Sequence, residues 1–174
     1  MRYNPDKHHR RSIRLKGYDY SRAGAYFVTI CIQERECLFG EVIDGEMHLN
    51  DAGRMIECWL GELTKKFPSV VLDDSIVMPN HLHGIIFLKS ITQTPDRPTL
   101  GDTMDWFKTM TTNEYIRKVR HSGWRGFPGR LWQRDFHDHI IRDEEELKSI
   151  REYIRQNPVR WAWDRENPAA VPEP

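Results

Sequence analysis

Two apolar runs separated by a turn pair constrain the fold of this chain most. "VVLDDSIVM" (70–78) and "HLHGIIFL" (81–88) are rich in aliphatic and β-branched residues, and Pro79-Asn80 lies between them. Strands joined by so short a turn pair antiparallel. A third run, "AYFVTICIQE" (25–34), is aromatic and β-branched and predicts a central strand. An antiparallel sheet is therefore expected.

Helical patterns accompany these strands. Apolar residues recur at helical spacing through "AGRMIECWLGELTKKF" (52–67), which Asn50 or Asp51 could cap. A second helix is predicted over "LGDTMDWFKTMTTNEYIRKVR" (100–120). Between the first strand and the first helix, Asp44-Gly45 indicates a β-hairpin.

A third helix is predicted near the carboxy end. Asp143 as N-cap and Glu146 three residues later form a capping box. Asn157-Pro158 should end this helix, because the residue before proline resists the helical region. The order of elements predicts an α+β fold with helices packed on an antiparallel sheet. We expect a basic arm over residues 1–22, one domain over 23–163 and a flexible tail over 164–174.

Composition indicates an ordinary soluble domain, with 39% hydrophobic and 30% charged residues in 174. The longest apolar run, residues 25–32, is far too short to span a bilayer. The amino terminus has positive charge but no apolar segment or cleavage site of a secretory signal. The three cysteines form no CxxC pair, which favours reduced thiols and a cytoplasmic location.

The net charge is zero because basic regions and acidic regions of the chain balance each other. Residues 1–22 carry seven Lys or Arg against two Asp, and residues 117–134 carry six basic residues and no carboxylate. A polyanion responds to such local clusters rather than to the net charge.

The histidine pair His81 and His83 is the strongest candidate for a metal site. In a strand the two side chains project from one face, while Leu82 projects from the other. Adjacent imidazoles on one face can bind one divalent ion, but a third ligand is needed and no local cysteine or HExxH helix supplies it. The alternative is a pair of polar side chains on a solvent-facing strand.

The third helix offers the missing ligand. Tyr153 and Asn157 are four residues apart and share a helix face, so an amide oxygen next to a phenol could complete a His-His-amide site. The tetrapeptide "EYIR" also surrounds Tyr115, but Val119 stands where the amide would be. Tyr153 is therefore the candidate nucleophile and Tyr115 an ordinary helix residue. The alternative is that Tyr153 is only a half-buried helix aromatic.

This combination suits phosphodiester chemistry. A phenol has a pKa near 10 and is a weak nucleophile at neutral pH. A divalent ion that polarises a phosphoryl oxygen makes the phosphorus easier to attack. The resulting phosphotyrosine conserves the bond energy, so strand rejoining needs no ATP, and the chain has no Walker A motif.

Four segments carry a resemblance to a known family: "YFVTI" (26–30), "VMPNHLHGII" (77–86), "LWQRDFHDHIIR" (131–142) and "YIRQNPVR" (153–160). The chain resembles the HUH single-strand DNA transposases, most closely the REP-associated tyrosine transposases. The resemblance implies a ferredoxin-like or RRM-like fold, Mg²⁺ or Mn²⁺ as cofactor, and cleavage of single-stranded DNA next to a hairpin with a 5′-phosphotyrosine. It places the nucleophile at Tyr153 and the metal ligands at His81, His83 and Asn157. Its members act as monomers or homodimers.

Within the matching segments, His139 is a candidate for supporting the site, with a packing role as the alternative. The expected DNA contacts are residues of the two basic clusters. Their basic side chains can neutralise phosphates, and their aromatic rings can stack on unpaired bases. The expected residues are Arg10, Arg11, Arg14, Arg117, Lys118, Arg120, Trp124, Arg125, Arg130 and Arg134, with Phe127 and Trp132 as further stacking surfaces. Alternatively, the tryptophans are core residues and the arginines a solvated face.

Two other functions remain open at this point. One is a non-catalytic regulator that binds hairpin DNA through the same fold. The other is a metal-dependent phosphodiesterase in which water attacks and the tyrosine only packs.

Overall fold

The computed structural model describes residues 19, 22–90 and 98–172. Most of the predicted basic arm, including Arg10, Arg11 and Arg14, lies outside the described residues. The elements in chain order are β1 (Gly24–Cys31), the 3₁₀ turn η1 (Gln33–Arg35), β2 (Gly40–Ile43), β3 (Glu46–Leu49), α1 (Asp51–Lys66), β4 (Val70–Val77), β5 (His81–Leu88), α2 (Leu100–Ser122), β6 (His137–Ile141), α3 (Glu144–Arg160) and the 3₁₀ turn η2 (Trp161–Trp163).

The main sheet has the order β4-β5-β1-β6, and each neighbouring pair is antiparallel. With α1 before β4 and α2 before β6, this is the split βαβ arrangement of ferredoxin-like folds. The predicted α+β class, the β4–β5 pair and the central position of β1 are confirmed. The predicted hairpin at Asp44-Gly45 is also present, as the separate β2–β3 ribbon.

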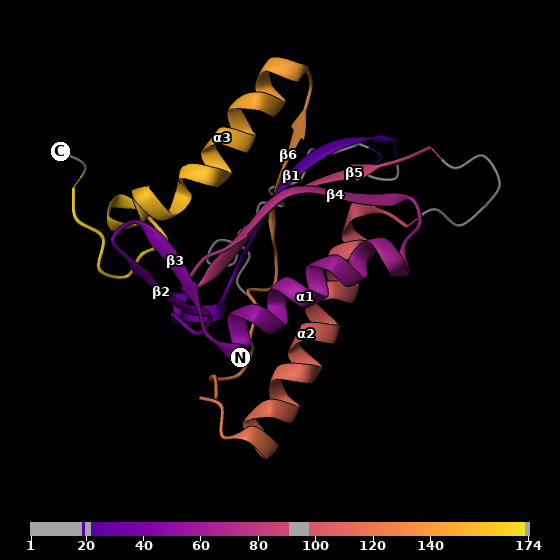
Figure 1. Cartoon of the computed structure of the whole chain (residues 1–174). Coiled ribbons are helices and arrows are strands. Elements are labelled where there is room, and N and C mark those ends of the chain that lie inside the picture. The colour runs from indigo at the N-terminus through magenta and orange to yellow at the C-terminus, as the bar shows by residue number, and fades with distance from the viewer. Residues whose placement is uncertain (1–18, 20–21, 91–97, 173–174) are drawn as a thin grey trace, which may run out of the picture.

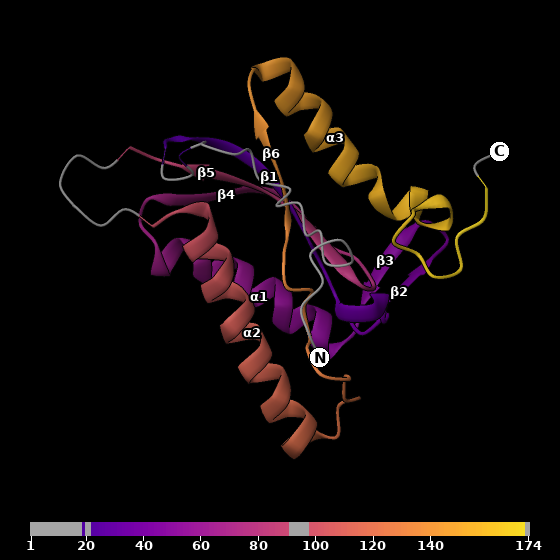
Figure 2. The same cartoon turned by 180° about the vertical axis from the view of Figure 1, so that it is seen from behind.

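The helices divide between the two faces of the sheet. Helices α1 and α2 cover one face, and α3 crosses the other (Figures 1 and 2). Alternation along β5 follows this division, because Leu82 and Ile86 join the core under α1 and α2 while Ile85 joins Leu147 and Ile154 under α3. His81 and His83 have the parity of Ile85, so they face α3.

The start of α3 agrees with the prediction, and its end does not. Asp143 caps the helix as expected, with its side chain accepting from the Glu146 N–H at 2.8 Å. The Glu146 carboxylate accepts instead from the Arg142 N–H at 2.8 Å, so the reciprocal half of the capping box is made one residue earlier. The predicted stop at Asn157 is wrong, since the helix continues through Pro158 to Arg160. Burial of Asn157 and Pro158 outweighs the local preference against helix before proline.

Strand β6 was not predicted, because "HDHII" has neither clear alternation nor a β-rich composition. It completes the sheet at the free edge of β1. No helix in the described ranges has the length and apolar character needed to cross a membrane.

Candidate active site

A cleft of about 410 Å³ opens on the α3 face of the sheet. Its lining residues come from β1, β5, β6, α3, η2 and the segment after η2: Phe27, Thr29, His83, His137, Asp138, His139, Tyr153, Asn157, Arg160, Trp163, Asp164, Arg165 and Glu166. The candidate nucleophile and two of the three candidate ligands therefore border one cleft of a single chain.

The two imidazoles are buried side by side, with ring centres 4.6 Å apart. The Asn80 amide nitrogen donates to the Arg35 and Glu166 carbonyls, which turns its oxygen toward Nδ1 of His81 at 2.9 Å. The Thr29 hydroxyl lies 2.7 Å from Nδ1 of His83. When Nδ1–H donates in each ring, Nε2 carries a free lone pair, which is how partners of this kind orient metal-binding histidines.

Three buried acceptors at this site have no hydrogen-bond partner. They are Nε2 of His81, Nε2 of His83 and Oδ1 of Asn157, and the only others among the described residues are Asp74 Oδ2 and Asp138 Oδ1. Buried polar atoms without partners cost about 1–3 kcal/mol each, so these three atoms are candidates to accept from a donor or to bind a cation. In the described ranges no three His, Cys, Asp or Glu side chains could hold a metal, so an ion bound by His81 and His83 would require a ligand of another type, such as the Asn157 amide.

Burial also keeps these imidazoles neutral. It lowers the pKa of His83 well below its usual 6.5, and the neighbouring His81 and Arg165 act in the same direction. Burial lowers the pKa of His81 as well, against the opposing effects of Asp164, Glu166 and Asn157. Neutral imidazoles are the form that binds a metal ion.

Tyr153 lies directly beside the histidines. Its ring is 5.4 Å from that of His83 and 5.9 Å from that of Phe27, and the residue is 38% exposed. Burial and the Asp164 carboxylate raise the pKa of Tyr153, while a hydrogen bond from Asn157 lowers it. Asn157 lies one helical turn after Tyr153 on α3 and borders the same cleft.

Tyr115 occupies a different environment despite its identical flanks. Its ring is fully buried against Trp124 and Phe127, and its hydroxyl donates to the Arg125 carbonyl at 3.0 Å. It lies on α2, across the sheet from the cleft.

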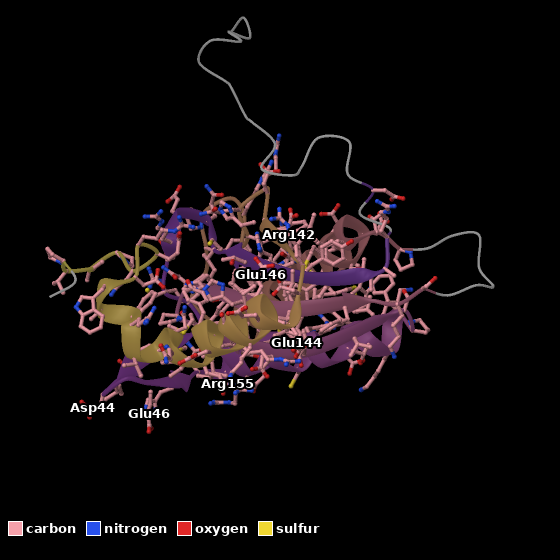
Figure 3. The ribbon with its side chains drawn as sticks, turned by 90° about the horizontal axis from the view of Figure 1, so that it is seen from above. Asp44, Glu46, Arg142, Glu144, Glu146 and Arg155 are labelled. Atoms are coloured by element: carbon pink, nitrogen blue, oxygen red, sulfur yellow. The ribbon has the colours of Figure 1, made fainter. Side chains whose placement is uncertain are left out.

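His139 borders the cleft together with His137. Its Nε2 lies 2.5 Å from the Glu146 carboxylate, which ties β6 to the first turn of α3. Figure 3 shows Arg142 and Glu146 close together at this junction. The contact is compatible with the expected supporting role, because it holds the start of the helix that bears Tyr153.

The basic residues predicted to contact DNA lie mostly away from the cleft. Arg117, Lys118 and Arg120 belong to α2, on the opposite face of the sheet (Figure 1). Arg125 pairs with Glu36 at 2.7 Å. Arg130 and Arg134 border a separate hollow beside η1.

The predicted stacking surfaces in this region are partly core residues. Trp132 is buried and donates to the Thr111 hydroxyl at 2.9 Å, so the expectation that it stacks on bases is wrong. Trp124 and Phe127 are half-buried against Tyr115.

No local sequence pattern indicates that Thr29 and Asn80 hold the imidazoles, or that the segment after η2 borders the cleft. Asp164 and Glu166 border the cleft within the predicted tail, and the Glu166 carboxylate pairs with Arg35 at 3.1 Å. Strand alternation predicts that Thr29 lies on the same face as Phe27. Its pairing with His83 depends on the register of two strands, which alternation does not specify.

No protein-family model matches the chain. It is 40% identical over 181 residues to an uncharacterized protein of Haemophilus influenzae, covering 94% of this chain and 96% of that protein. It is 26% identical over 152 residues to a protein of the same organism named "Putative REP-associated tyrosine transposase", covering 82% of this chain and 74% of that protein.

The fold also matches that of a REP-associated tyrosine transposase solved bound to a REP hairpin, with a TM-score of 0.60 and 19% identity over 87% of this chain and 76% of that one. The ferredoxin-like sheet, with a His-x-His strand facing a tyrosine on a helix, agrees with the resemblance that the sequence carries. The resemblance to REP-associated tyrosine transposases is therefore confirmed by one sequence relative and by the fold of a solved structure.

Proposed function

We propose that the chain is a metal-dependent tyrosine transposase that cleaves and rejoins single-stranded DNA next to hairpin sequences through a 5′-phosphotyrosine intermediate. The observation that carries this proposal is the presence of three unpartnered buried acceptors, on the adjacent rings of His81 and His83 and on Asn157, at a cleft that the phenol of Tyr153 also borders. The hairpin bound to the structural relative supports hairpin DNA as the partner.

His81, His83 and Asn157 would hold the divalent ion, Mg²⁺ or Mn²⁺. When bound, the ion would polarise a phosphoryl oxygen and offset its negative charge. Asn80 and Thr29 keep the two imidazoles oriented. All three ligands belong to one chain, so a monomer contains the complete set.

Tyr153 would supply the nucleophile. Its Oη forms a bond to phosphorus, the bond from phosphorus to the 3′ oxygen breaks, and that oxygen leaves as a hydroxyl after taking up a proton. The raised pKa of Tyr153 means that the phenol is protonated at neutral pH and must lose its proton during attack. Contacts with His83 and Phe27 orient the ring while leaving one side open to the cleft. Attack by a 3′ hydroxyl on the phosphotyrosine reverses the step and rejoins DNA.

The test is a denaturing gel of protein incubated with a labelled single strand that carries a hairpin, with Mn²⁺ or Mg²⁺. The wild-type protein should give a denaturant-stable protein–DNA adduct, and Tyr153→Phe should give none. Tyr115→Phe is the matched control, because it changes the same residue in the same "EYIR" context. It loses one hydrogen bond, worth about 1 kcal/mol of stability, but leaves the cleft intact.

Each alternative gives a distinct result in this assay. An adduct that persists in Tyr153→Phe would rule out Tyr153 as the nucleophile. Cleavage without an adduct would favour a phosphodiesterase that uses water. Tight hairpin binding without cleavage would favour a non-catalytic regulator.

A further inference from the structure

The rim of the cleft beyond Tyr153 carries an aromatic ring with no assigned role. Trp163 in η2 borders the same cleft as Tyr153 and is 37% exposed. Among the described residues no aromatic ring packs against it. Trp161, two residues earlier, packs instead near His81, with ring centres 5.9 Å apart. The two tryptophans of η2 therefore have different roles, one structural and one facing the opening.

Two arginines flank this ring. Arg160 ends α3 and Arg165 follows η2, and both border the cleft. Arg160 is exposed and makes no ion pair with any described residue. Arg165 is largely exposed and shares the Glu166 carboxylate, at 3.1 Å, with Arg35.

An exposed indole and two cations on the rim of one cleft match one ligand chemistry in particular. A nucleobase offers a flat face for stacking only when it is unpaired, and the adjoining phosphates carry the negative charge. A DNA strand that presents a phosphate to Tyr153 passes along this rim, because Arg160, Trp163 and Arg165 border the same cleft.

We infer that Arg160, Trp163 and Arg165 form a subsite for an unpaired nucleotide of the DNA strand next to the reacting phosphate. Trp163 stacks on the base, and the two arginines contact phosphates. This inference rests on the proposed function for the identity of the strand. The DNA contacts predicted for Arg117, Lys118 and Arg120 remain a separate prediction, because these residues lie on the other face of the sheet.

The test measures binding without chemistry. In a Tyr153→Phe background, the affinity for a fluorescent oligothymidylate is compared among variants by anisotropy. Trp163→Leu should weaken binding about 5-fold to 100-fold, the range expected for loss of one stacked base. Trp163→Phe keeps an aromatic face and should retain most of the affinity.

The charged residues are tested by salt dependence. Arg160→Ala should weaken binding and reduce the slope of log K against log salt by about 1, as for one lost phosphate contact. Arg117→Ala on α2 is the matched control and should change neither value. A blunt duplex of equal length should bind equally to the Trp163→Leu variant and its parent.

A second readout does not depend on how well the leucine variant folds. Oligothymidylate should quench the intrinsic tryptophan fluorescence of the Tyr153→Phe protein, and Trp163→Phe should remove most of that quenching. Unchanged quenching, or equal affinity of Trp163→Leu and its parent, would overturn the subsite.

The subsite and the chemistry can fail separately. Binding that depends on Trp163, in a protein whose wild type gives no adduct, would overturn the proposed reaction and keep the subsite. If the wild type forms an adduct but binding does not depend on Trp163, the proposed reaction stands and the subsite is overturned.

Discussion

At the scale of single residues, Asn157 joins the two halves of the proposed site. It is 1% exposed, and its amide affects both the Tyr153 phenol and the His81 imidazole. An amide is neutral at every pH, so it adds an oxygen to two neutral imidazoles without competing for a proton. The protonation state of the histidines is therefore the main pH-sensitive property of the ligand set.

His83 should make the metal-free protein less stable in acid. Its folded pKa is well below 6.5, whereas the unfolded chain takes up the proton near 6.5. Between these two values the unfolded state binds more protons, so stability falls as the pH falls below about 6.5 and is fully present above it.

Urea unfolding at pH 7.5 and 5.5 in the presence of a chelator measures this loss. His83 should account for at most about 1.4 kcal/mol of the difference, and His83→Gln should remove that share. An equal pH dependence in wild type and His83→Gln would show that the imidazole is protonated freely in the folded state.

At the scale of elements, a β-bulge fastens α3 to the sheet. Leu72 pairs with Ile86 and Ser75 with Gly84, so Asp73 and Asp74 together face only Ile85. Both carboxylates reach α3. Asp73 accepts a hydrogen bond from Nε of Arg151 at 2.8 Å, and Asp74 Oδ2 forms an ion pair with Nε of Arg155 at 2.8 Å that lacks hydrogen-bond geometry. Figure 3 shows Arg155 on the side of α3 away from Glu146. The helix that carries Tyr153 is therefore held along both sides.

Arg151→Ala should destabilise the protein more than Arg155→Ala. The Arg151 side chain is 31% exposed and that of Arg155 69%, and exposure weakens an ion pair by solvent screening. We expect a loss of about 1 kcal/mol for Arg151→Ala and less than about 0.5 kcal/mol for Arg155→Ala in urea unfolding.

Lys65→Ala is the control for this comparison, because its exposed pair with Glu62 on α1 is remote from α3. The rate of adduct formation should fall in Arg151→Ala and stay unchanged in Lys65→Ala. Equal unfolding free energies for Arg151→Ala and Lys65→Ala would contradict the role of the bulge.

Elements with strong local signals could be predicted from the sequence, and those set by packing could not. The start of α3 follows from Asp143 alone, because an N-cap is a local hydrogen bond. Its end depends on the burial of Asn157, which is a tertiary contact. Strand β6 depends on pairing with β1 at Thr29 and Phe27, which no pattern within "HDHII" indicates.

At the scale of the whole molecule, the proposed site exists only in the folded chain. Its ligands lie on β5 and α3, their orienting partners Thr29 and Asn80 on β1 and in the β4–β5 turn, and the rim follows η2. Alternation and helical spacing gave the faces of His81, His83, Tyr153 and Asn157. Periodicity does not specify which helix covers which face of a sheet. The contact between the histidine face of β5 and the tyrosine face of α3 therefore follows from chemistry and family resemblance.

Metal binding should therefore stabilise the fold. An ion that binds only the assembled ligands shifts unfolding by mass action, by about 1.4 kcal/mol at a concentration ten times its dissociation constant. Thermal unfolding with increasing Mn²⁺ should show a midpoint that rises in the wild type and, after addition of a chelator, returns to its metal-free value. In Asn157→Ala the rise should be much smaller, because one ligand is missing.

Asn113→Ala is the matched control, since it removes an exposed amide from α2, two residues before Tyr115. Its midpoint should rise with Mn²⁺ as in the wild type. An equal rise in Asn157→Ala would place the ion elsewhere on the molecule and separate Asn157 from the ligand set. A rise that is lost in Asn157→Ala and kept in Tyr153→Phe would assign the ion to the amide and imidazoles, and leave the phenol free to act as the nucleophile.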